Sequence, residues 1–255
     1  AMQLNADFVA TGHYCRRETT EIKGKEVHHL KAGLDTNKDQ SYFLCEVNEA
    51  SLSRALFPVG ELDKPEVRAL AEKLQLKTHD KKDSTGICFI GERKFKDFLE
   101  QYLPAQPGDI ATAAGDIIGK HAGLMYYTIG QRQGLHIGGL ANYDEAPWFV
   151  ASKDLDTNTL IVVQGVDNPL LFAQTLSTSS PLWVNSQAPD LPLRCHAKIR
   201  YRQNDQACLV KETESGLVVE FDEPQRAITP GQYLVMYSED RCLGAAIIEE
   251  AHSGK

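Results

Sequence analysis

The sequence predicts an α+β protein with several domains, in which an α/β part is followed by a small antiparallel β-barrel or sandwich. In two segments of the first half, apolar residues recur with helical spacing. From Trp148 onward, apolar and polar residues alternate with a period of two, as in half-buried strands. Between these parts, residues 104–146 are rich in glycine and predict loops. A chain of 255 residues is long enough for two modest domains.

The α/β part begins with a short apolar strand at 7–14 that runs into a turn at Gly12. A helix is predicted over 64–74, where Pro65 occupies a position that the first turn of a helix tolerates. Its apolar residues fall at i, i+3, i+4 and i+7: Val67, Leu70, Ala71 and Leu74. The same spacing predicts a second helix over 95–103, before Pro104.

The second half predicts a series of short strands. Residues 148–152 and 159–164 predict a β-hairpin, because a run of turn-forming residues separates two alternating segments. Further strands are predicted at 194–202, 207–212, 217–222, 232–238 and 242–249. Several short strands at this spacing suggest a barrel or sandwich of roughly 80–90 residues.

Composition narrows the class of protein. The chain carries 27 Lys and Arg against 35 Asp and Glu, a net charge of −8, which argues against a protein that coats nucleic acid through bulk charge. The mean hydropathy is −0.34, and no apolar run reaches the length that spans a bilayer. The first eight residues show no secretory signal. The six cysteines lack metal-site or C-x-x-C spacing, so we expect no metal, reduced thiols and a cytoplasmic protein.

The strand predicted at 194–202 carries four positive charges and no negative one. Alternation places the basic residues on one face: Arg194, His196, Lys198, Arg200 and Arg202. A solvated outer face is the plainer reading of this pattern. A stripe of one sign nevertheless requires an anionic partner or close acidic neighbours, and a phosphate backbone is the natural partner.

Cys88 is the second candidate. Residues 77–96 hold six basic and three acidic residues, and nearby cations favour a reactive thiolate. Gly86 and Gly91 bracket the thiol and allow the segment to bend. The alternative is that residues 87–90 form a buried strand with an inert thiol.

Two short motifs carry weaker signals. Gly12 and His13 follow the first predicted strand, and strand ends of this kind bind nucleotides in open α/β sheets. A structural histidine is the alternative there. The run Lys38-Asp39-Gln40 is either the start of a helix or a charged turn.

Eight short motifs, taken together, are a more specific signature of a protein family than any one of them. They are Ala10-Thr-Gly-His-Tyr14, Gly33-Leu-Asp-Thr-Asn-Lys-Asp-Gln-Ser-Tyr-Phe43, Phe57-Pro-Val-Gly-Glu-Leu62, Lys82-Asp-Ser-Thr-Gly-Ile-Cys-Phe-Ile-Gly-Glu92, Tyr102-Leu-Pro-Ala-Gln-Pro-Gly108, Thr128-Ile-Gly-Gln-Arg132, Arg200-Tyr-Arg202 and Thr229-Pro-Gly-Gln232. In this order they resemble the bacterial tRNA-specific 2-thiouridylase (MnmA) family. The motif around Cys88 is the most specific of them.

The resemblance implies the C-terminal part of a PP-loop ATP-pyrophosphatase domain at 1–92, a small central domain at 93–160 and a C-terminal antiparallel β-barrel at 161–255. It also implies a reaction in which ATP adenylates the 2-carbonyl oxygen of the wobble uridine of a tRNA. Sulfur from a cysteine persulfide then replaces that oxygen, and AMP is released.

The resemblance assigns roles to single residues. Cys88 matches the cysteine that carries the persulfide, and Gly12 matches a backbone contact to ATP. The positions that match tRNA contacts are His13, Lys38, Asp39, Gln40, Arg200, Tyr201 and Gln232. No metal is implied except the Mg²⁺ that accompanies ATP.

The partners implied are the tRNAs for lysine, glutamate and glutamine, and a cysteine desulfurase or sulfur-relay protein as sulfur donor. No membrane partner is implied. The family's Ser-Gly-Gly-Val-Asp-Ser loop, which cradles the ATP phosphates, does not occur in this chain. We therefore expect the C-terminal portion of a 2-thiouridylase, inactive by itself. The alternatives are a non-catalytic tRNA-binding module and a thiol sulfur-carrier protein that uses Cys88.

Overall fold

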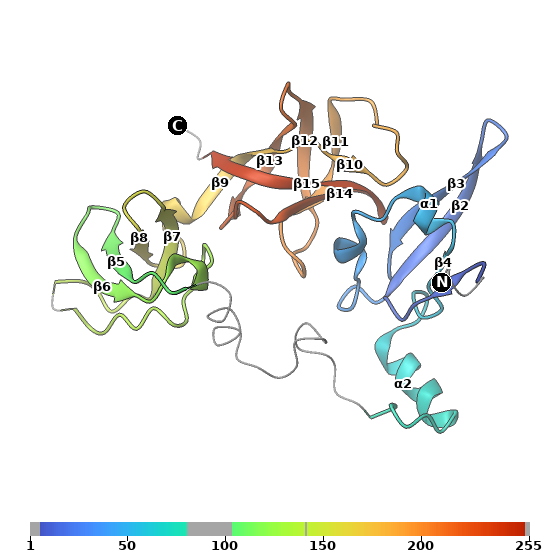
Figure 1. Cartoon of the computed structure of the whole chain (residues 1–255), viewed down its shortest axis with the longest axis horizontal. Helices are drawn as coiled ribbons and strands as arrows, with labels where there is room; N and C mark the ends of the chain where they lie inside the picture. Colours follow the sequence, from blue (N-terminus) through green and yellow to red (C-terminus); the bar gives the residue numbers. More distant parts are fainter. Residues whose placement is uncertain (1–5, 81–103, 141, 253–255) are drawn as a thin grey trace. The chain divides into compact units, whose positions relative to one another are not determined.

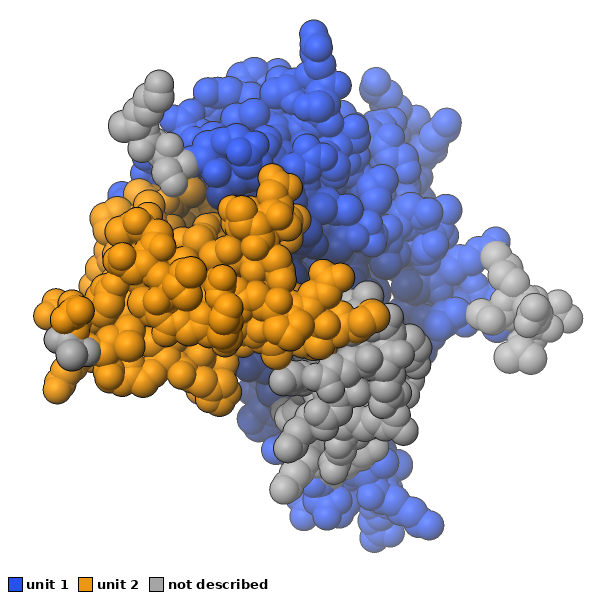
Figure 2. Space-filling view, turned by 60° about the vertical axis from the view of Figure 1, so that its left-hand side comes forward, with its two compact units in different colours: residues 1–81, 174–223, 230–252 blue, residues 82–173, 224–229, 253–255 orange. Residues whose placement is uncertain are grey.

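The computed structural model describes residues 6–80, 104–140 and 142–252. The helix predicted over 95–103 and the candidate Cys88 lie outside these residues. The chain divides into two compact units, which Figure 2 shows in different colours. Unit 1 comprises residues 1–81, 174–223 and 230–252, and unit 2 comprises 82–173, 224–229 and 253–255.

Unit 1 starts with two short parallel strands, β1 (Val9–Ala10) and β4 (Ala55–Leu56). Between them lies an antiparallel hairpin of β2 (Cys15–Ile22) and β3 (Lys25–Ala32), which the sequence did not predict. Lys23 and Gly24 make its turn with positive φ angles of 52° and 74°. The 3₁₀ helix η2 (Ser41–Leu44) and the short helix α1 (Glu49–Leu52) follow the hairpin.

Helix α2 (Lys64–Lys73) confirms the helix predicted over 64–74. Asp63 and Glu66 form a reciprocal capping box at its start, and Pro65 lies in the first turn. The Lys64 amide also donates to Asp35 Oδ2 at 3.0 Å, which ties this helix to the preceding loop. No residue of the helix is buried, so its start is defined by capping rather than by packing.

The predicted barrel or sandwich is a closed barrel (Figure 1). Its six strands are β9 (Phe172–Thr178), β11 (Leu193–Lys198), β12 (Gln206–Glu212), β13 (Leu217–Arg226), β14 (Tyr233–Ser238) and β15 (Arg241–His252). They are hydrogen-bonded in the order β14-β11-β12-β13-β9-β15, and a further pairing of β14 with β15 closes the ring. The short strand β10 (Leu182–Trp183) pairs with β15. Closure removes the exposed edges that an open sheet would have.

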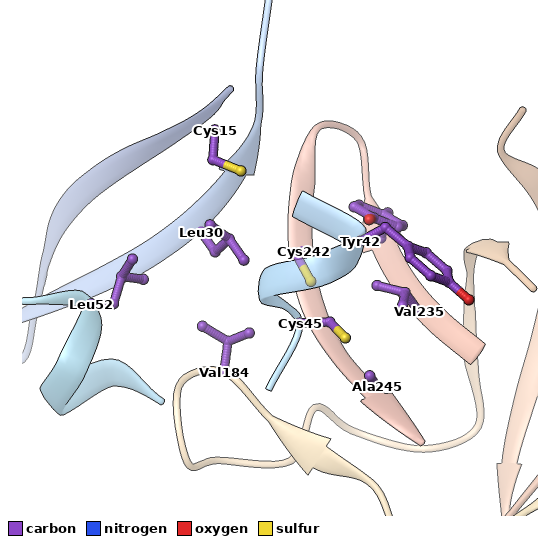
Figure 3. Close-up of a cluster of buried hydrophobic side chains, with 10 residues drawn as sticks. Cys15, Leu30, Tyr42, Cys45, Leu52, Val184, Val235, Cys242 and Ala245 are labelled. Carbon is purple, nitrogen blue, oxygen red and sulfur yellow. The ribbon is translucent and has the colours of Figure 1, made fainter. Parts of the chain in front are cut away.

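Strand β15 connects the barrel to the hairpin. Arg241 pairs with Lys31 and Cys242 with Leu30, so β15 continues from the barrel onto β3. A hydrophobic core lies at this junction (Figure 3) and draws its residues from the hairpin, η2, α1, β14 and β15. Its buried members are Cys15, Leu30, Tyr42, Cys45, Leu52, Val184, Val235, Tyr237, Cys242 and Ala245. The junction is therefore held by apolar burial as well as by backbone hydrogen bonds.

Unit 2 contains a four-stranded sheet in the order β6-β5-β8-β7. Its elements are β5 (Gly108–Thr112), β6 (Ile117–His121), η3 (Leu124–Tyr126), β7 (Trp148–Asp154), β8 (Thr159–Gln164) and η4 (Pro169–Leu171). The antiparallel pair β7 and β8 confirms the predicted hairpin. The prediction that residues 104–146 form loops is wrong at β5 and β6, where Ile110 and Ala111 are buried in the sheet. Gly115, with a φ of 96°, forms the turn between these two strands.

The described residues contain few helices, and none of these combines the length and the apolar character needed to cross a membrane.

His29 is a buried titratable group in the hairpin, with 3% of its surface exposed. Its Nδ1 lies 2.8 Å from the Asn185 amide nitrogen and its Nε2 lies 2.8 Å from Thr20 Oγ1. A neutral ring fits both partners, because Nδ1 accepts from the amide while Nε2 donates to the hydroxyl. Burial lowers the pKa of His29 below its usual value of 6.5.

This lowered pKa predicts a loss of stability in mild acid. Below about pH 6.5 the unfolded chain binds a proton at His29 more readily than the folded chain does. The free energy of unfolding therefore decreases as the pH is lowered. We expect His29→Asn to flatten this dependence between about pH 7.5 and 5. Urea unfolding at several pH values measures it. His28→Asn, next in the chain, is the matched control and should retain the wild-type slope.

Candidate functional site

A cleft of about 450 Å³ lies in unit 1, where two segments far apart in the sequence meet. One wall comes from the loop before η2 and the other from the turn after β11. The lining residues are Thr36, Asn37, Lys38, Asp39, Tyr42, Lys198, Tyr201, Arg202, Gln203, Asn204 and Asp205. Three of the predicted tRNA-contact residues, Lys38, Asp39 and Tyr201, therefore line one cleft, whereas Arg200 precedes Tyr201 in the chain and does not line it.

Asp39 holds the two walls together. Its side chain is only 7% exposed, and Oδ1 accepts from the Gly33 and Ser41 amides at 3.1 and 3.0 Å. Its Oδ2 accepts from Ser41 Oγ at 2.9 Å and lies 3.5 Å from Lys198 Nζ, at the end of β11. The Ser41 hydroxyl in turn lies 3.0 Å from the hydroxyl of Tyr237, which belongs to the core at the junction of hairpin and barrel. Asp39 is thus a structural residue of the cleft, because its hydrogen-bonding capacity is already used within the protein.

Gln40 connects the cleft to the first strand. Its Oε1 accepts from the Tyr14 amide at 3.0 Å, and its own amide donates to the Tyr14 carbonyl at 3.0 Å. His13 precedes Tyr14, and its Nδ1 lies 2.7 Å from Thr11 Oγ1. The turn that carries Gly12 and His13 is therefore tied to the loop that carries Lys38.

The basic strand is shorter than predicted. β11 ends at Lys198, and the chain turns at 199–204, where Arg202 has a positive φ of 68°. The prediction of a continuous basic face at 194–202 is therefore wrong. The turn forms because Gln203 Oε1 accepts from the Ile199 amide at 2.9 Å, which ends the strand.

Acidic neighbours occupy part of the predicted basic face. Arg194 makes two hydrogen bonds of 2.7 and 2.9 Å to Asp222, and Lys198 lies between Asp39 and Asp205. Arg202 is exposed, and among the described residues no carboxylate pairs with it. The positive charge that remains for a ligand is thus concentrated at the turn rather than spread along a strand.

Tyr42 forms the floor of the cleft. Its hydroxyl donates to the Tyr233 carbonyl at 2.9 Å, and burial raises the pKa of Tyr42 to about 12, so the phenol stays protonated. Gln232, the last predicted tRNA contact, precedes Tyr233 in the chain and is exposed. Gln232 therefore lies next in the chain to Tyr233, whose carbonyl binds the hydroxyl of Tyr42 at the floor of the cleft.

The five described cysteines are reduced and buried. Burial raises the pKa of both Cys15 and Cys45 to about 12 and raises that of Cys242 well above its usual value. Cys195 and Cys208 face each other across β11 and β12, with their sulfur atoms 3.8 Å apart. None of these five thiols is placed as a nucleophile, because all five are buried away from any substrate. In the described ranges, no group of His, Cys, Asp or Glu side chains could hold a metal ion.

Sequence reasoning missed the residues that build the cleft from within. Lys198 was expected on a solvated face, but it is an internal partner of Asp39. Ser41 and Tyr237 were not singled out at all. An Asp two residues before a Ser is a local turn signal that was present in the sequence, whereas the contact with Tyr237 spans most of the chain.

Three family models match the chain in succession. They are the tRNA methyl transferase HUP domain at residues 1–92, the tRNA methyl transferase PRC-barrel domain at 96–164 and the aminomethyltransferase β-barrel domain at 173–248. A protein of Alcanivorax borkumensis named tRNA-specific 2-thiouridylase MnmA is 58% identical over 251 residues, which cover 98% of this chain and 68% of that protein. The chain belongs to the tRNA-specific 2-thiouridylase family.

Two further members with the same name support this membership. The one from Pseudomonas fluorescens (strain Pf0-1) is 59% identical over 98% of this chain, and the one from Marinomonas sp. (strain MWYL1) is 60% identical over 98%. These matches cover 66% and 64% of the two relatives, so the chain spans slightly less than two thirds of their length. The HUP and barrel folds expected from the resemblance are those of the matching family models.

The position of Asp39 predicts a structural effect of its replacement. Asp39→Asn removes the charge that faces Lys198. It also replaces one of the two accepting carboxylate oxygens by an amide nitrogen, which cannot accept from the backbone amides or the Ser41 hydroxyl that now donate to Asp39. We expect the free energy of unfolding to fall by about 1–3 kcal/mol, as when a buried charged hydrogen-bond network loses a partner. Urea unfolding measured by circular dichroism tests this.

Asp205→Asn is the matched control, because Asp205 faces the same Lys198 nitrogen at 3.4 Å from an exposed position. An exposed pair contributes little, so this variant should unfold within about 1 kcal/mol of the wild type. Equal effects of the two substitutions would contradict the role of Asp39 as the buried link.

Proposed function

We propose that this protein takes part in the 2-thiolation of tRNA and that the cleft between Lys38 and Arg202 binds the tRNA. The observation that supports this most directly is that Lys38, Tyr201 and Arg202 line one cleft although 163 residues separate Lys38 from Tyr201 in the numbering. Cations beside an aromatic ring and amide side chains suit a nucleic acid, which offers phosphates, base faces and base edges.

The electrostatics of the cleft support an anionic ligand of defined position. Lys198 already pairs with Asp39 and Asp205, so its charge is neutralised within the protein. Arg202 lies at the open side, where it can pair with a phosphate. Lys38 lines the opposite wall. A phosphate bridging the two walls would meet a cation from each.

For the reaction, we propose the chemistry that the family resemblance implies. ATP, with Mg²⁺, would adenylate the 2-carbonyl oxygen of the wobble uridine, and the outer sulfur of a persulfide on Cys88 would attack C2 with loss of AMP. A second thiol would then attack the Cys88 sulfur, form a disulfide with it and leave the transferred sulfur on the base. Gly12 fits a backbone contact to ATP: it follows the carboxyl end of β1, is exposed, and has no atom within 4 Å of the place where a Cβ would lie. We further propose the tRNAs for lysine, glutamate and glutamine as substrates and a cysteine desulfurase or relay protein as sulfur donor.

The proposed phosphate contact predicts the effect of Arg202→Gln. Loss of one cation should weaken tRNA binding about tenfold at low salt and reduce the slope of log K against log salt by about 0.9. Filter binding with an unmodified tRNA transcript over a series of salt concentrations measures both quantities. A variant that carries both Arg200→Glu and Arg202→Glu reverses two charges and should reduce the salt dependence of binding further.

Arg194→Gln is the matched control. It removes the same charge from β11, the strand that leads into the turn of Arg202, but Arg194 is held by both carboxylate oxygens of Asp222. Its replacement should leave the tRNA affinity and the salt slope close to those of the wild type. If Arg194→Gln and Arg202→Gln weaken binding equally, the barrel attracts RNA through general charge and the cleft is not the site.

The proposed sulfur chemistry predicts that only Cys88 accepts a persulfide. Incubation with a cysteine desulfurase and ³⁵S-cysteine should label the wild type, and Cys88→Ser should abolish the label. Cys195→Ser, a buried thiol, is the control and should keep it. Labelling without tRNA binding would instead support the sulfur-carrier alternative, and tRNA binding without labelling the non-catalytic module.

A further inference from the structure

Phe43 is an apolar side chain in an unusual position. It lies in η2 between buried Tyr42 and half-buried Leu44, yet its own side chain is 58% exposed. The helix holds it there, since the Phe43 amide donates to the Gln40 carbonyl at 3.0 Å and Ser41 is fixed by Asp39.

The ring of Phe43 forms a continuous aromatic surface with the turn after β11. Its centroid lies 4.3 Å from that of Tyr201, with 43° between the ring planes. Tyr42 supports both rings, at 5.8 Å from Phe43 and 6.4 Å from Tyr201. The Arg202 guanidinium carbon lies 5.6 Å from the Tyr201 centroid. Phe43, Tyr201 and Arg202 thus form a row in which two aromatic rings end in a cation.

This row borders the cleft already described. Tyr201 and Arg202 line the cleft together with the amide side chains of Asn37 and Asn204. Tyr201 also packs on the core at the junction of hairpin and barrel, so the row rests on a rigid support. Aromatic faces beside cations and amides are the combination by which proteins hold single-stranded RNA.

We propose that Phe43 and Tyr201 form a stacking platform for an unpaired nucleobase of the tRNA, with Arg202 beside it for a phosphate. The platform rests on the proposed tRNA-binding function and assigns to Phe43 a contact that complements the charged ones. A base-paired stem keeps its base faces covered, so the platform selects nucleotides in a loop. This small aromatic row beside the polar cleft suits one base better than an apolar protein surface.

The test compares variants of Phe43 in tRNA binding. Phe43→Ala should weaken binding of an unmodified tRNA transcript about five- to hundredfold, the range for loss of one base stack, and leave the salt slope unchanged because no charge is lost. Phe43→Trp should bind as tightly as the wild type or more tightly. Phe43→Leu keeps an apolar side chain without a ring and should stay weak. Thermal unfolding confirms that the variants remain folded.

Two controls distinguish base stacking from a general loss of exposed apolar surface. Leu182→Ala changes a side chain with a similar exposure of 56% on the barrel and should not alter binding. An RNA stem-loop should lose affinity with Phe43→Ala, whereas the blunt duplex of the same stem should not, since it has no unpaired base.

Each contrary result has a distinct meaning. If the wild-type chain binds no tRNA, the proposed function fails and the platform fails with it. If the wild type binds and Phe43→Ala binds equally well, or Phe43→Leu matches the wild type, only the stacking platform is overturned. Equal losses on the stem-loop and on the duplex would also overturn it.

Discussion

The cleft depends on the buried carboxylate of Asp39. A charge removed from water costs several kcal/mol unless hydrogen bonds and an opposite charge compensate it. Here two backbone amides, one hydroxyl and Lys198 provide that compensation. Because the amides belong to the loop before η2 and Lys198 ends β11, the same contacts that satisfy the charge also set the distance between the two walls. A ligand that bridges the walls therefore meets a prepared gap.

The three consecutive residues Lys38, Asp39 and Gln40 divide the work of this site. Asp39 points into the protein. Gln40 binds the backbone of Tyr14 twice: its side-chain oxygen accepts from the Tyr14 amide, and its backbone amide donates to the Tyr14 carbonyl. Lys38 lines the same wall of the cleft and brings the positive charge that a phosphate would meet. Of the three residues that the family motif presents as one unit, Lys38 is thus the candidate contact, and Asp39 and Gln40 position the walls of the cleft.

Local signals in the sequence predicted local structure well. Asp63, Pro65 and Glu66 mark the start of α2, and the turn after Asp154 marks the hairpin of β7 and β8. The hairpin of β2 and β3 was missed because charged residues occupy both of its faces and hide the period of two. The end of β11 could not be predicted either. It is set by Gln203, which lies beyond the strand, and by Asp39, which lies 159 positions before Lys198.

The acidic total of the chain and an RNA partner are compatible because charge acts locally. At physiological salt, screening limits the attraction between exposed charges to about 8 Å, so a phosphate responds to Arg202 and Lys38 rather than to the net charge of −8. The exposed carboxylates that carry the rest of this net charge would repel a duplex that approaches elsewhere on the protein. On the proposed function, binding would then come from contacts in the cleft, where the aromatic faces add to the cations of Lys38 and Arg202. An acidic protein that binds in this way would gain selectivity for unpaired nucleotides, because the same charges weaken its general affinity for nucleic acid.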